Sequence, residues 1–217
     1  MSFRRFAGPV LALGALLVAA PAFAGPPLLC HPFEIGQAQS LPWDGSRSWF
    51  QGRAGYDIRH LIPDTEALLT PSTPVIVRME TLRRAVIYAS QDPAVARELL
   101  RTTIDRARAA ESSGHPNALA YLDAAYVSEA LREITMLDQM AEFRKSAAQL
   151  RDVVERGSGY ALIQKSLALT PDDAALHFAA ALIAADGNRA AYAAHATKAR
   201  AGAEGNSLLA RNIQHVS

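Results

Sequence analysis

The fold is decided by residues 140–200, which read MAEFRKSAAQLRDVVERGSGYALIQKSLALTPDDAALHFAAALIAADGNRAAYAAHATKAR. Apolar residues recur there every three or four positions, and Gly, Pro, Asp and Asn interrupt them, which predicts short helices joined by tight turns. The clearest break is Thr170-Pro171-Asp172-Asp173. We expect Thr170 to cap a new helix, with Pro171 in its first position and the aspartates at the positive end of its dipole.

The helix after this break carries apolar residues on two faces. They are Leu176, Phe178, Ala179, Ala180, Leu182, Ile183 and Ala185. Such a helix is expected to pack between neighbours. The chain breaks again at residues 186–188, and the following helix is predicted to turn Tyr192 inward.

Within residues 140–173, large, small and proline residues follow a regular order. The positions are Phe143, Ser146, Ala147, Leu150, Gly159, Ile163, Ser166 and Pro171. In this order the chain resembles the tetratricopeptide repeat (TPR), a helix–turn–helix unit of about 34 residues. The resemblance extends over about residues 140–207, although His177 replaces the large aromatic of the second window. It implies helical hairpins stacked as a short TPR-like α-solenoid, whose concave face binds proteins or peptides.

Helical patterns also fill residues 64–137, and proline-led breaks at positions 74, 93 and 116 separate them. Each interval holds one helix and a tight turn, so successive helices should be antiparallel neighbours. We therefore predict an all-α helical-repeat domain over residues 64–217. In the helix after position 74, the arginines Arg78, Arg83 and Arg84 are expected to lie mostly on the solvent side.

Residues 1–24 have the pattern of a secretion signal. Arg4 and Arg5 precede an apolar run, and Ala22-Phe23-Ala24 forms a small-x-small cleavage site. The apolar run is shorter than an ordinary membrane span of about 20 residues. The mature protein is thus expected to be exported, to a bacterial periplasm or the medium, with no membrane span after cleavage.

The charge of the mature chain argues against a nucleic-acid partner. Of 22 Lys and Arg residues, Arg4 and Arg5 leave with the signal, so 20 remain against 21 Asp and Glu. Nucleic-acid binders and polybasic membrane-surface proteins need concentrated positive charge.

Residues 25–63 form an irregular arm rich in proline and glycine, which forbid a long helix there. Both tryptophans of the protein, Trp43 and Trp49, lie in this arm, as does Tyr56. The aromatic residues either anchor the arm on the helical body or form a partner-binding surface. We expect residues 28–58 to cover one end or the concave face of the repeats. A short last helix should cover the other end, with Leu209 inside and Asn212 outside.

Cys30 is the only cysteine, so an intramolecular disulfide is impossible. Its thiol could be buried, lipidated, paired with another chain or chemically reactive, and burial is the favoured reading. His31 follows it directly, and a Cys-His pair could ligate a soft metal.

No short catalytic motif occurs in the sequence, and no cofactor or metal site is predicted. Among the histidines, His177 and His195 could meet across adjacent helices, with Asp173 close enough to supply a third ligand. Two histidines alone make a poor zinc site, so a packing role is favoured for them.

Two hypotheses of function follow. The first is an exported, non-enzymatic module that binds a protein or peptide on its helical repeats. The alternative is an exported enzyme or metal-handling protein that uses Cys30, His31 and the aromatic arm.

Overall fold

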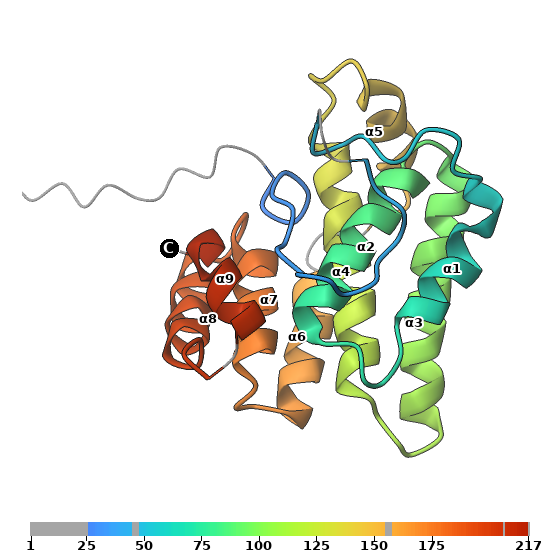
Figure 1. Cartoon of the computed structure of the whole chain (residues 1–217). Helices are drawn as coiled ribbons and strands as arrows, with labels where there is room; N and C mark the ends of the chain where they lie inside the picture. Colours follow the sequence, from blue (N-terminus) through green and yellow to red (C-terminus); the bar gives the residue numbers. More distant parts are fainter. Residues whose placement is uncertain (1–25, 45–47, 155–157, 206, 217) are drawn as a thin grey trace, which may run out of the picture.

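The computed structural model describes residues 26–44, 48–154, 158–205 and 207–216; the predicted signal peptide, residues 1–24, lies outside this part. Within it the protein is all-α, as predicted (Figure 1). No strand occurs among the described residues, where a single isolated bridge joins Trp43 to Gly52. None of their helices combines the length and apolar character that crossing a membrane requires.

The helical elements begin slightly before the predicted domain boundary at residue 64. They are η1 (Ile58–His60), α1 (Leu61–Leu68), α2 (Val75–Ala89), α3 (Pro93–Ser112), α4 (Ala118–Thr135), α5 (Arg144–Leu150), α6 (Ser158–Leu169), α7 (Ala174–Ala184), α8 (Arg189–Ala201), α9 (Ser207–Asn212) and η2 (Ile213–Val216). The described residues before Ile58, 26–44 and 48–57, are irregular, and they are called the arm.

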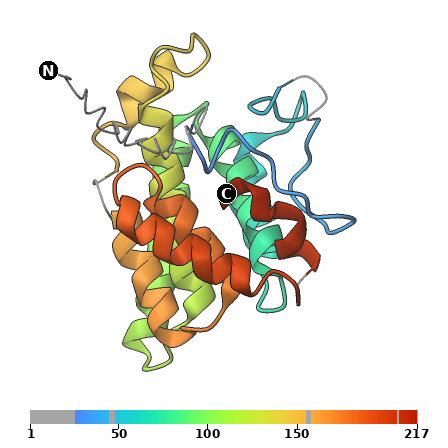
Figure 2. The ribbon, with the colours of Figure 1, turned by 90° about the vertical axis from the view of Figure 1, so that its left-hand side faces the viewer.

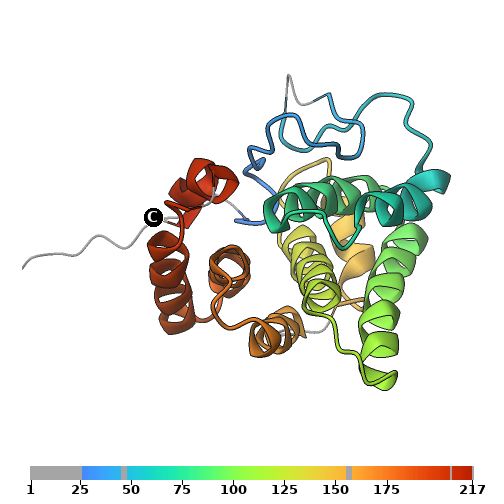
Figure 3. The same ribbon diagram turned by 60° about the horizontal axis from the view of Figure 1, so that its bottom comes forward.

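Antiparallel hairpins of successive helices are clearest for α3 with α4 and for α7 with α8 (Figures 1 and 3), whereas α4 also packs against α6, beyond the short α5. Helix α4 lies at the centre, because it contacts α2, α3, α5, α6 and α7. Helix α7 is buried from Ala175 to Ala184, in agreement with its two predicted apolar faces. Tyr192 of α8 also faces inward, as expected.

The cap of α7 differs from the prediction. Asp173, not Thr170, caps the helix: its Oδ1 accepts hydrogen bonds from the Ala175 and Leu176 N–H groups, at 2.8 and 3.0 Å. The Thr170 hydroxyl instead donates to the Ser166 C=O at the end of α6, over 3.3 Å. Thr170 therefore lies directly after the last residue of the preceding helix, α6, and bonds its C-terminal end.

The prediction that the arginines of α2 face solvent was wrong. Arg78 and Arg83 are 2 % and 0 % exposed, and Arg84 is only partly exposed. The arm covers the outer side of α2 (Figure 3), so the helix is enclosed on all sides. Arg78 pairs with the buried Asp123 of α4, 2.7 Å away, and Arg106 of α3 bonds the same carboxylate oxygen.

The C-terminal helices lie beside α7 and α8, and the arm meets them (Figure 2). Leu209 of α9 is buried, as expected for the last cap. Asn212 was predicted outside, yet it is fully buried because its amide binds the backbone of the arm.

Candidate functional site

The described part of the arm is held mainly through its backbone, by polar side chains that project from the helical body. These side chains belong to Glu80, Arg83, Arg84, Tyr88, Tyr126, Glu133 and Asn212. We call them the arm-binding surface. They come from α2, α4 and α9, which are far apart in sequence.

The first contact is made at Leu28. Its N–H donates to both carboxyl oxygens of Glu133, 3.1 Å away, and its C=O accepts from the Tyr126 hydroxyl at 2.7 Å. Both partners lie on α4 and are buried. Burial raises the pKa of Glu133 well above its ordinary value. Burial therefore disfavours the ionised form of this carboxyl group.

The second contact centres on the ion pair of Glu80 and Arg83, both fully buried. The Arg83 guanidinium donates twice to the Glu80 carboxylate, at 2.7 and 2.9 Å. The same guanidinium also binds the arm: its Nη1 donates to the C=O groups of Leu29 and Trp49, at 3.2 and 3.0 Å. The Glu80 carboxylate in turn accepts the Phe33 N–H, at 3.0 Å.

The ionised form of Glu80 is stabilised despite its burial. Burial alone would raise the pKa of this carboxyl, but the guanidiniums of Arg83 and Arg84 and the Phe33 N–H hold it below its ordinary value. The pKa values of Glu80 and Glu133, which bind the same segment, are thus shifted in opposite directions. Glu80 has two bonded guanidinium partners, whereas burial is the largest influence on Glu133.

Further contacts follow along the arm. Arg84 donates to the Leu41 C=O at 2.7 Å, and the Tyr88 hydroxyl donates to the Pro42 C=O at 2.5 Å. At the other side, Asn212 Oδ1 accepts the Glu34 N–H and Nδ2 donates to the Glu34 C=O, at 2.8 and 2.9 Å. An amide side chain that bonds both the N–H and the C=O of one residue recognises the backbone, whatever side chain that residue has.

Side-chain contacts of the arm are mostly apolar. Five of its described residues are buried, among them Pro27. Leu28, Leu29 and Leu41 are completely covered, and Phe33 packs edge-on against Phe178 with ring centres 5.9 Å apart. Backbone hydrogen bonds together with pockets for a few apolar side chains are a common way of binding a peptide. Here the bound segment makes a turn at residues 27–31.

The three aromatic residues singled out in the sequence lie on the helical body and are partly buried. Trp43 packs edge-on against Tyr88, 5.7 Å away, with the Arg83 guanidinium 4.9 Å from its ring centre. Trp49 stacks on Phe143 of the α4–α5 connection at 5.6 Å. Tyr56 contacts the Tyr88 ring at 4.5 Å, and its hydroxyl donates to Asp64.

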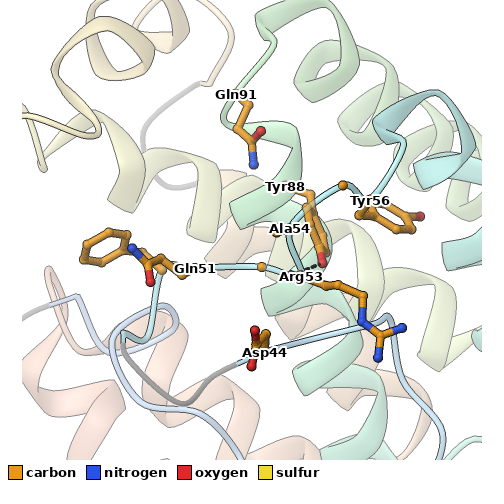
Figure 4. Close-up of a pocket in the computed structure, with 10 residues that line it drawn as sticks. Asp44, Gln51, Arg53, Ala54, Tyr56, Tyr88 and Gln91 are labelled. Atoms are coloured by element: carbon orange, nitrogen blue, oxygen red, sulfur yellow. Dashed lines mark hydrogen bonds between the residues drawn. The ribbon is translucent and has the colours of Figure 1, made fainter.

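Between Tyr88 and the loop of residues 50–56 lies a hollow of about 620 Å³ (Figure 4). Gly52 passes so close to Tyr88 that an added Cβ would lie 2.3 Å from the ring, so only glycine fits. The Arg53 N–H donates to the Tyr88 hydroxyl over 2.7 Å. Tyr88 is thereby shared between two passes of the arm.

Cys30 is half-buried beside Glu133. Burial, together with the carboxyl of Glu133, raises the pKa of the thiol to about 11, which leaves little thiolate at neutral pH. The neighbouring His31 points to a different partner, because its ring lies 5.6 Å from the ring of His215. The described residues contain no group of three or more side chains that could together ligate a metal ion.

The structure brings His177 and His195 together, with their Nδ1 atoms 3.0 Å apart. Burial, with contributions from His177 and Lys198, lowers the pKa of His195. Asp173, the possible third ligand, is occupied in capping α7.

The sequence did not predict the arm-binding surface. Those of its members that were considered were expected to be exposed polar residues or apolar residues of a helix face. One signal was present: in α2, Arg78, Glu80 and Arg83 stand among large apolar residues that go all round the helix. Comparisons of the chain with protein-family models, with curated proteins and with solved structures found no match.

Proposed function

We propose that the protein is an exported, non-enzymatic module that binds an irregular peptide segment on its arm-binding surface. The observation that supports this is the set of hydrogen bonds from buried side chains to the N–H and C=O groups of Leu28, Leu29 and Phe33. A surface built to satisfy backbone groups accepts any segment that offers the same backbone and a few apolar side chains.

The arm acts as an intramolecular ligand of this surface. A segment tethered at one end has an effective concentration on the order of millimolar, so a partner peptide binds only by displacing it. The partner is expected to present two adjacent large apolar residues, as Leu28 and Leu29 do, and a large apolar residue at the place of Phe33.

The test uses a fluorescent synthetic peptide with the sequence of residues 26–44. It is titrated into the wild-type chain and into the Leu29→Ala variant, whose own arm binds less tightly. A buried Leu→Ala change costs about 2–5 kcal/mol, so the variant should bind the peptide at least ~30-fold more tightly than the wild type does. Anisotropy measures the affinity.

Two controls make the result specific. A peptide in which Leu28, Leu29 and Phe33 are replaced by serine should not bind. The Arg84→Met variant, combined with Leu29→Ala, should bind the original peptide more weakly because it lacks the donor to the Leu41 C=O. If a Leu29→Ala chain with normal helical circular dichroism binds neither peptide, the arm has only a structural role and the proposal is wrong.

A further inference from the structure

The pair formed by His177 of α7 and His195 of α8 has an unusual geometry. The two Nδ1 atoms are 3.0 Å apart, while the ring centres are 5.1 Å apart. The difference of 2.1 Å is what two rings require when both nitrogens lie between the ring centres. Each Nδ1 therefore directs its lone-pair position at the other.

The outer nitrogens fix the tautomer of one ring. His177 Nε2 lies 2.8 Å from the Pro171 C=O, which only accepts, so Nε2 carries the proton and Nδ1 presents a lone pair. In the neutral pair, His195 must then donate from Nδ1 and accept at Nε2, where the Tyr160 hydroxyl lies 3.4 Å away. A hydroxyl both donates and accepts, so it suits either tautomer of His195.

We infer that His177 and His195 form a two-coordinate site for a soft monovalent cation of the Cu⁺ or Ag⁺ class, bound between their Nδ1 atoms. Such d¹⁰ ions accept two nitrogen ligands in a line, and imidazole is a suitable donor for copper. On binding, the proton of His195 moves from Nδ1 to Nε2. The new Nε2–H group then donates a hydrogen bond to the Tyr160 hydroxyl oxygen. No proton leaves the neutral pair.

The surroundings match those of a ligating histidine. Metal-bound imidazoles almost always donate their second nitrogen to a carbonyl, carboxylate or water, as His177 does to Pro171. Metal–nitrogen distances are about 2.0–2.1 Å for zinc, so an ion held in a line needs the two nitrogens about 4 Å apart. His195 is only half-buried and can turn outward by the missing ångström or so.

The ligand number excludes a zinc site of the usual kind. Structural and catalytic zinc ions take at least three protein ligands. Asp173 is the nearest carboxylate in sequence, and its Oδ1 is bonded to the N-terminus of α7. The histidine pair thus favours a metal ion that is stable with two protein ligands.

The probe is Ag⁺, which does not change its oxidation state, added to the mature chain with Cys30→Ser so that the thiol does not compete. Nitrogen-15 spectra of the histidine rings report the site. One equivalent of Ag⁺ should move the His195 proton from Nδ1 to Nε2 and split both Nδ1 signals by coupling to silver. Zn²⁺ at the same concentration should leave them unchanged.

Variants separate this site from other soft donors. His195→Gln should weaken Ag⁺ binding by more than the roughly 10–100-fold loss that follows removal of a group hydrogen-bonded to a metal ligand. His115→Gln, at an exposed histidine, should have no effect. If His195→Gln binds Ag⁺ as tightly as the parent, or if Ag⁺ does not shift the Nδ1 signals of the pair, the histidines share a hydrogen bond only and the inference is overturned.

Discussion

Replacing Arg83 by methionine tests whether buried charge holds the arm in place. The guanidinium donates four hydrogen bonds, two to Glu80 and one each to the C=O groups of Leu29 and Trp49. Methionine keeps most of the aliphatic stem but leaves the Glu80 carboxylate buried without its main partner. Breaking a buried ion pair in this way costs about 3–5 kcal/mol. At about 2–4 °C per kcal/mol for a chain of this size, the variant should melt about 6–20 °C lower.

Two measurements check this prediction. Circular dichroism follows the melting of the helices, and tryptophan fluorescence follows the arm, because Arg83 bonds the Trp49 backbone and lies against the Trp43 ring. The variant's emission should shift to the red and become accessible to iodide below the main transition. Arg101→Met is the matched control: this arginine pairs with Glu98 and Asp105, but it is 62 % exposed, so the melting temperature of the variant should not change measurably.

The outcome that contradicts the reasoning is equally specific. If Arg83→Met has the same melting temperature as Arg101→Met, and iodide does not reach the tryptophans more easily, the arm is held by its apolar side chains alone. The buried ion pair would then be energetically replaceable by packing, as is known for some buried pairs.

Three further predictions concern buried titratable groups. Because burial raises the pKa of Glu133, its contribution to stability is complete below about pH 4.5 and falls as the pH rises through the raised pKa; in urea unfolding at pH 5 and 8, Glu133→Gln should therefore show a smaller decline than the wild type. The Cys30 thiol, with its pKa raised from 9.0 to about 11, should react with a thiol reagent at pH 7 about 100-fold more slowly in the folded chain than in urea; equal rates would mean an open, reactive cysteine. Asp123→Ala leaves the buried Arg78 without its carboxylate and should cost about 3–5 kcal/mol in chemical unfolding, whereas Asp105→Ala on the exposed face of α3 should leave the midpoint unchanged.

The helices could be predicted because their ends are encoded locally. Asp92 caps α3 and Pro93 follows it in the first turn, while Gly114 leaves the helix with a φ of +77° that favours glycine. Asn188 caps α8 through the N–H of Ala191. The error at Thr170 arose because two residues of the same turn can serve as caps, and only the path of the chain decides between them.

The arm-binding surface could not be predicted, because its members carry no local mark of burial. Arg83 and Glu80 stand three residues apart on α2, a spacing that on most helices gives an exposed ion pair. Their burial depends on a segment some fifty residues earlier in the chain, whose position is set by tertiary contacts. Asn212 depends in the same way on Glu34, 178 residues away in sequence.

The composition of α2 follows from the irregularity of the arm. A segment that forms no helix or strand leaves its N–H and C=O groups unsatisfied, and burying such groups without partners costs about 1–3 kcal/mol each. Apolar side chains could cover Leu28 and Leu29, but they could not bond the backbone. Arg83 and Glu80 supply a donor and an acceptor at that place, and each neutralises the charge of the other. Helix α2 binds an irregular segment along its outer side. It therefore carries charged residues at buried positions where apolar residues would otherwise be expected.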